Sequence, residues 1–103
     1  MAHWSLVTYT RPSTEVAWFT PGSEVLNVIE TLKSDNTITT YQKSESSDGL
    51  KQYYKICFKD QESALAMESN ETYMSNATAR QTYCTENNIT CLVEQFEEAE
   101  PIV

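Results

Sequence analysis

The segment from Leu50 to Phe58 restricts the fold most strongly, because apolar and polar side chains alternate along it. Successive side chains of a β-strand point to opposite faces of a sheet, so each face receives every second residue. One face would carry Lys51 and Lys55. The other face would carry Leu50, Gln52, Tyr54, Ile56 and Phe58. The pattern therefore predicts a strand with one face against a hydrophobic core.

Turn and capping residues on both sides of this strand extend the prediction. The preceding loop, Ser46–Gly49, ends in Asp48-Gly49, which is typical of the turn of a β-hairpin. Thr37–Lys43, before that loop, is alternating and β-branched, and predicts the partner strand. Asp60 follows the strand and is a good N-cap residue for a helix. We therefore expect a hairpin followed directly by a helix.

The first part of the chain predicts another strand and another helix. His3–Tyr9 is rich in aromatic and β-branched residues, as strands are. Its two faces would carry Trp4, Leu6 and Thr8 on one side and Ser5, Val7 and Tyr9 on the other. Thr20 is expected to cap a helix that has Pro21 at its first position. Apolar residues then recur at helical spacing and predict one buried stripe, formed by Val25, Val28, Ile29 and Leu32.

The last part of the chain predicts a helix and a final strand. The helix after Asp60 is expected to be interrupted near Asn70-Glu71. It should stop at Asn87-Asn88, because asparagine tolerates the left-handed conformation that ends many helices. The final strand is expected over Ile89–Phe96, with Cys91 and Val93 on one face and Leu92 and Phe96 on the other.

The order of these elements predicts an α+β fold of the ferredoxin-like type, strand-helix-strand-strand-helix-strand. In this arrangement a four-stranded antiparallel sheet has both helices on one face. Residues 1–97 are expected to form a single domain, and residues 98–103 a loose acidic tail.

Charge and cysteine content exclude several classes of function. Fifteen acidic and seven basic residues give a formal net charge of −8, which repels phosphate backbones. Nucleic acids and anionic membranes are therefore disfavoured as partners. No targeting segment and no apolar run near the ~20 residues of a membrane span occur. Cys57, Cys84 and Cys91 lack metal-ligand spacing, so we expect buried thiols, a cytoplasmic location and neither metal nor cofactor.

The expected sheet would leave one face without helices. Tyr9, Tyr53, Cys57 and one of the two apolar sets of the last strand are candidates to line that face. An open sheet face with aromatic side chains is a natural surface for a second copy of the chain. The sequence therefore predicts a homodimer through the helix-free face.

Two segments, taken with the element order, resemble a known superfamily. Phe58-Lys59-Asp60 with Ala64 and Leu65, and then Tyr83–Ile89, look like the second helix and its return to the last strand in the dimeric ferredoxin-like, or dimeric α/β-barrel, proteins. That group includes small cofactor-free monooxygenases of the antibiotic-biosynthesis type, muconolactone isomerases and stress-responsive barrel proteins. The chain also resembles small ferredoxin-like proteins of marine microbial or phage origin. The resemblance implies the fold and pairing as a dimeric α/β barrel, and it brings no catalytic residue.

Aromatic residues and one arginine form the candidate site. Two interpretations are open: the aromatics form core and interface, or some of them line an apolar cavity between sheet and helices. Arg80 could bind a carboxylate or polarise a carbonyl, or it could form a surface ion pair with Glu86 or another acidic residue. The lone His3 is expected at the surface or a strand edge, without a catalytic role. The candidate ligand-binding residues are Trp18, Phe19, Tyr54, Tyr73, Arg80 and Tyr83.

Three functions remain open on the sequence. The first is binding of a small apolar or acyl-chain-like molecule, which the number of aromatics favours. The second is a cofactor-independent monooxygenase or isomerase, which the scarcity of acid–base residues in the apolar stretches disfavours. The third is a phage or bacterial interaction or structural accessory protein without catalysis.

Overall fold

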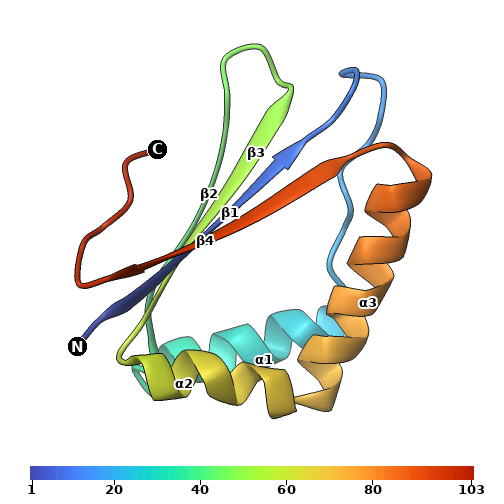
Figure 1. Ribbon diagram of the computed structural model, residues 1–103. Helices are drawn as coiled ribbons and strands as arrows, with labels where there is room; N and C mark the ends of the chain where they lie inside the picture. The colour runs from blue at the N-terminus through green and yellow to red at the C-terminus, as the bar shows by residue number, and fades with distance from the viewer.

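A computed structural model describes all 103 residues and shows a single antiparallel sheet of four strands (Figure 1). The strands lie in the order β2-β3-β1-β4, so the first strand is central. Their bounds are β1 His3–Thr10, β2 Ile38–Glu45, β3 Lys51–Phe58 and β4 Thr90–Glu97. The alternating segment Leu50–Phe58 thus forms β3, the other central strand.

Helices cover one face of this sheet, as Figure 1 shows. They are α1 Ser23–Ser34, α2 Gln61–Ala66, the short 3-10 helix η1 Met67–Ser69 and α3 Glu71–Glu86. The predicted ferredoxin-like α+β fold is confirmed. The expected interruption of the second helical region near Asn70 is confirmed as well, because α2 and α3 are separate helices. No helix in the structure combines the length and the apolar character that crossing a lipid bilayer requires.

Local capping groups set the starts of α2 and α3. The cap at Asp60 is the one that the sequence predicts, whereas Asn70 was expected only to interrupt the helix. Asp60 Oδ1 accepts a hydrogen bond from the backbone N–H of Ser63 at 2.7 Å, and begins α2. Asn70 Oδ1 accepts from the backbone N–H of Tyr73 at 2.8 Å, and begins α3. These bonds satisfy N–H groups that have no partner inside the helix. After α3, Asn88 has a φ of 58°, the left-handed conformation expected there.

The predicted start of α1 is wrong by two residues. The N-cap is Gly22, with extended backbone angles, and the helix begins at Ser23 rather than at Pro21. The Gly22 N–H instead donates to Asn76 Oδ1 of α3 at 3.3 Å. The local Thr20-Pro21 signal is overridden because this stretch of chain runs across to α3 before it turns into α1. The buried stripe of α1 is present, with Val25 and Ile29 at its centre.

The strand register decides which side chains face the helices. Tyr9 of β1 pairs with Gln52 of β3, and Val7 pairs with Tyr54, so all four point to the helix side. The prediction that Tyr9 lines the helix-free face is therefore wrong. Tyr53 does lie on the helix-free side, as expected, because it alternates with its neighbours on β3.

The core beneath the helices consists of two clusters. One lies under α3 and contains Val7, Tyr9, Cys84 and Ile89. The second lies between α1, α2 and the sheet and contains Ile29, Ile38, Phe58 and Met67. Most of the aromatic candidates of the sequence pack against these clusters rather than inside them.

Residues 98–103 lie outside the helices and strands, but two of them are held against the sheet. Lys55 points to the helix-free side of β3, and its Nζ forms an ion pair with Glu100 Oε2 at 2.7 Å. Pro101 is buried, and so are Trp4 and Leu6, which also point to the helix-free side. Figure 1 shows this segment on the side of the sheet away from the helices. We call residues 98–103 the tail. It covers part of the face predicted to be bare.

His3 is also placed differently from the prediction. It is only 2% exposed, and its Nδ1 lies within hydrogen-bond distance of Glu97 Oε1. Its Nε2 is 3.1 Å from Gln95 Oε1. The ring therefore ties the start of β1 to the edge strand β4. His3 is buried because β1 is a central strand of the sheet. The sequence around His3 does not reveal that position.

Candidate functional site

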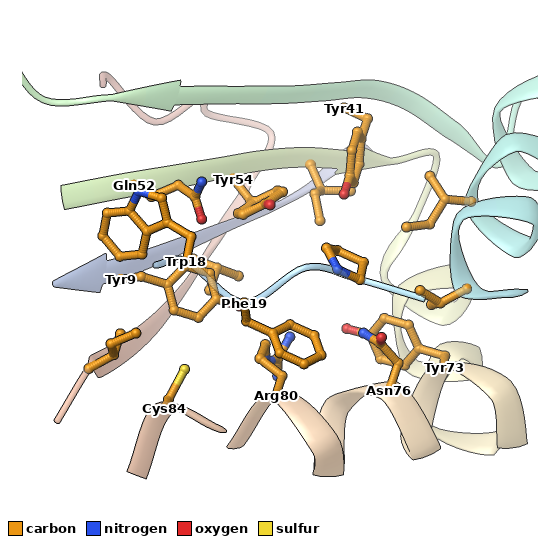
Figure 2. Close-up of a pocket in the computed structure, with 16 residues that line it drawn as sticks. Tyr9, Trp18, Phe19, Tyr41, Gln52, Tyr54, Tyr73, Asn76, Arg80 and Cys84 are labelled. Carbon is orange, nitrogen blue, oxygen red and sulfur yellow. The ribbon is translucent and has the colours of Figure 1, made fainter. Parts of the chain in front are cut away.

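A cavity of about 70 Å³ lies between the sheet and the helices (Figure 2). Its floor is the helix side of β1, β2 and β3, and its opposite wall is formed by α1 and α3. The segment of residues 11–22, which we call the strap, closes one side of it with Trp18, Phe19 and Pro21. Twelve of the sixteen lining residues are hydrophobic.

The strap is fixed at Trp18 by groups from three parts of the chain. The guanidinium of Arg11 lies over the indole at 4.3 Å from the ring centroid. The same guanidinium donates to the carbonyl oxygens of Gly49 at 2.8 Å and Val16 at 2.7 Å. The indole Nε1–H donates to Glu45 Oε1 at 2.8 Å. These contacts hold the strap against the tip of the β2–β3 hairpin, at the edge of the cavity.

Three tyrosines from adjacent strands line the floor. The rings of Tyr9 and Tyr54 are perpendicular with centroids 5.9 Å apart, and those of Tyr41 and Tyr54 are 6.0 Å apart. Burial raises the pKa of all three hydroxyls, to about 12 for Tyr41. The phenols are therefore neutral near pH 7 and can donate hydrogen bonds. No hydrogen bond within the protein uses the hydroxyls of Tyr41 and Tyr54.

Arg80 of α3 brings a positive charge to the cavity wall. Its Cζ lies 6.0 Å from the centroid of the Tyr9 ring, and its guanidinium points from α3 toward the sheet in Figure 2. The ion pairs of the structure join His3 to Glu97, Lys33 to Glu30 and Lys55 to Glu100. The alternative prediction, a surface pair with Glu86, is therefore not found. A half-buried guanidinium without a carboxylate is unusual in a chain of net charge −8.

Cys84, one helical turn after Arg80, also lines the cavity. Burial raises the pKa of its thiol, and that of the nearby Cys91 as well. Both thiols therefore stay protonated at neutral pH, and a protonated thiol is a poor nucleophile. Cys84 acts here as a small apolar side chain. The structure brings together no group of three or more His, Cys, Asp and Glu side chains that could hold a metal ion.

Gln52 belongs to the cavity, although the sequence analysis did not single it out as a site residue. It is 3% exposed and lies on β3 directly opposite Tyr9 of β1. Its amide has no hydrogen-bond partner in the protein, but its polar atoms keep some accessible surface, which borders the cavity. One signal could have identified it. Gln52 is the polar exception on the apolar face of the alternating segment Leu50–Phe58.

The structure brings five of the six predicted site residues together. Trp18, Phe19, Tyr54, Tyr73 and Arg80 all border the cavity. Tyr83 does not, because its ring lies against Phe19, with centroids 5.7 Å apart. Its hydroxyl donates to the carbonyl oxygen of Ala17 at 2.6 Å and so supports the strap from outside.

Comparison with known proteins supports the fold. No protein-family model matches the chain, and no curated protein matches it. A solved structure from Deinococcus radiodurans, provisionally named an antibiotic biosynthesis monooxygenase, aligns with a TM-score of 0.61 and 12% identity over 98% of this chain and 96% of that one. A dimeric ferredoxin-like protein of unknown function from Jannaschia sp. CCS1 aligns with a TM-score of 0.62 and 12% identity over 94% and 99%.

A third solved structure extends the same similarity. It is a dimeric ferredoxin-like protein from an uncultured marine organism, with a TM-score of 0.55 and 9% identity over 98% of each chain. Sequence identities this low support a shared fold and nothing more. The predicted resemblance to dimeric ferredoxin-like and monooxygenase-like proteins is therefore confirmed at the level of the fold.

Proposed function

We propose that the protein binds a small, largely apolar molecule with an acidic end in the cavity under the strap. The observation that carries this proposal is Arg80, a half-buried cation with no carboxylate partner beside an aromatic wall. An anionic ligand group would supply the missing charge, and a charge-assisted hydrogen bond is roughly twice as strong as a neutral one. The neutral phenols of Tyr41 and Tyr54 can donate to further oxygen atoms of the same ligand.

The size of the cavity limits the ligand. A buried water molecule needs at least ~10–15 Å³ of such space, so a cavity of about 70 Å³ has room for about five to seven waters. A single ring or a short branched chain is larger than this enclosed space, so it fits only with part of the ligand in the open mouth of the cavity or with a small shift of the strap. A long acyl chain would require a much larger movement of the strap. The proposal therefore concerns compact acids.

The test compares two probes of nearly equal size, benzoate and the neutral acetophenone, by titration calorimetry with the full chain. Arg80→Ala should weaken benzoate about tenfold or more, because a bond to a charged group contributes ~1.5–3 kcal/mol. Acetophenone should change less than about twofold. Lys33→Ala is the matched control, since it removes an equal charge that is paired with Glu30 on exposed α1. Equal weakening of both probes by Arg80→Ala, or no benzoate binding by the native protein, would contradict the proposal.

A cofactor-independent oxygenase or isomerase is the second candidate. The name of the Deinococcus radiodurans neighbour favours it, as do neutral phenols close to a guanidinium that could polarise a carbonyl. This second function would be supported if the purified protein converted a bound probe to a product and the Arg80→Ala variant did not. An interaction protein without a ligand becomes the better interpretation if the cavity takes up no small molecule.

We further propose that the protein is a homodimer that uses the helix-free face of the sheet. Two structural neighbours are named as dimeric ferredoxin-like proteins. On this chain Leu92 is 54% exposed on that face, next to Thr8. The tail occupies part of the same surface, so a second copy must displace it or pack around it. Light scattering should give about twice the mass of the 11.8 kDa chain. A monomer mass at micromolar concentration would contradict this proposal.

A cytoplasmic location is proposed from the thiols. Cys57, Cys84 and Cys91 are free, and two of them are buried. Free buried thiols are typical of reducing compartments. Fractionation of the producing cells tests this directly.

A further inference from the structure

Gln52 is a buried polar side chain without a protein partner. Only 3% of the residue is exposed, and its amide borders the cavity instead of a backbone group or another side chain. Buried polar groups in native proteins are nearly always hydrogen-bonded, to protein, to water or to a ligand. A nonpolar residue of the same length would fill this position on the apolar face of β3 without leaving an amide unpaired. Its polar atoms are not sealed off from the cavity, so the partner of the amide is either water or a ligand inside the cavity.

Gln52 lies next to one polar residue of the wall and faces another across the cavity. Its cross-strand neighbour is Tyr9, and the guanidinium of Arg80 lies 6.0 Å from the centre of the Tyr9 ring. We call these three residues the polar corner. Figure 2 shows that the corner spans the cavity, with Gln52 on the sheet and Arg80 rising from α3. The remaining wall is mostly aromatic or aliphatic, so a ligand has its polar groups here and its apolar body elsewhere.

The chemistry of the polar corner requires more than a carboxylate. A guanidinium has only donors, whereas a glutamine amide has two donors and one acceptor oxygen. A carboxylate satisfies Arg80, but it has no hydrogen to give to Gln52 Oε1. A ligand that satisfies both residues needs an acid and, next to it, a group that donates and accepts in one plane. An amide is such a group, because its N–H and C=O match the C=O and NH₂ of glutamine.

We propose that the cavity selects small carboxylates that carry a neighbouring amide, of which N-acylated α-amino acids are the simplest class. This inference rests on the proposed function, because it takes Arg80 as the site of the acid. In the complex, Arg80 holds the carboxylate and Gln52 pairs with the amide. The aromatic wall packs around the short apolar side chain of the ligand. Gln52 is thus the residue that determines specificity, and Arg80 is the residue that provides the charge.

The experiment uses two acids that differ by one group. N-acetylvaline is compared with its ester analogue, in which the amide N–H is replaced by oxygen at the same position. The native protein should bind the amide about tenfold more tightly, because the ester leaves a buried acceptor of Gln52 unpaired. In Gln52→Met, which has similar length but no amide, the two acids should bind within about twofold of one another. Gln42→Met is the matched control, since Gln42 is exposed on the helix-free side of β2 and should leave the tenfold preference unchanged.

A stability measurement shows that Gln52→Met still folds. Replacing an unpartnered buried amide by an apolar side chain should leave the thermal midpoint of the free protein unchanged or raise it. A clear fall would show that Gln52 has a structural partner and would overturn the inference. So would an equal affinity of the native protein for the two acids, or a preference for the amide that persists in Gln52→Met.

The benzoate titration separates this inference from the proposed function. If benzoate binds in a manner that depends on Arg80 and N-acetylvaline does not bind, the selectivity for amides is wrong and the acid site stands. If neither benzoate nor N-acetylvaline binds, both are wrong.

Discussion

Removal of the tail, leaving residues 1–97, should uncover the helix-free face and drive two copies of the chain together. Three contacts hold the tail in place. The Glu98 N–H donates to the carbonyl oxygen of Ala2 at 2.9 Å, Lys55 pairs with Glu100 at 2.7 Å, and Pro101 is buried. Beneath it, Trp4 and Leu6 are only 8% and 7% exposed.

The magnitude follows from what the tail covers. The Lys55 side chain is 13% exposed but Glu100 is 59% exposed, so their ion pair contributes about 1 kcal/mol or less. If about a third of Trp4 and Leu6 becomes exposed, roughly 100 Å² of apolar surface meets water, at a cost of about 2.5 kcal/mol. The uncovered face therefore gains about 3 kcal/mol of driving force for association, which is on the order of 100-fold in the dimerisation constant.

Sedimentation equilibrium of the native and truncated chains measures that constant. Tryptophan emission in a Trp18→Phe background reports Trp4 alone, and it should shift to the red in the truncated monomer at high dilution. Glu100→Gln removes only the ion pair and should therefore raise the dimerisation constant much less than truncation does. High salt should have the same small effect on the native chain, because it screens the ion pair. The reasoning is refuted if truncation leaves both the constant and the Trp4 emission unchanged. A fall in the constant would instead show that the tail belongs to the dimer interface.

Three further predictions concern stability. Asn70→Ala should lower the free energy of unfolding by about 1 kcal/mol in urea titration, because the cap of α3 is lost, whereas exposed mid-helix Asn27→Ala should not lower it. Gly49→Ala should cost about 1 kcal/mol or more in the same assay, since Gly49 has a φ of +72°, a conformation that alanine adopts only with strain. Burial raises the pKa of Tyr41 to about 12, so the folded state holds this proton more tightly than the unfolded state. The contribution of Tyr41 to the free energy of unfolding is complete below about pH 10 and is lost as the pH rises toward 12. Tyr41→Phe should therefore make the free energy of unfolding depend less on pH between about 10 and 12.

Local signals in the sequence were sufficient for the elements and their order. The alternation in β3, the caps at Asp60 and Asn70, and the left-handed Asn88 each depend on residues a few positions apart. Such short-range interactions form in the same way wherever the segment lies in the fold. For this reason the ferredoxin-like arrangement could be predicted without a structure. The candidate site residues were chosen by residue type; five of the six border the cavity, and their binding role stays a prediction.

The positions that depend on pairing between distant segments could not be predicted in this way. The register of β1 on β3 places Tyr9 and Gln52 side by side under Arg80, and nothing within β1 alone distinguishes its two faces. The start of α1 is set by the crossing of the strap to Asn76, and the tail is held by Lys55, forty-five residues before Glu100. The local sequence determines the periodicity of a helix or strand. The burial and the charge partner of each side chain depend instead on the segments that pack against it in the folded chain. The polar corner is therefore a property of the tertiary structure alone.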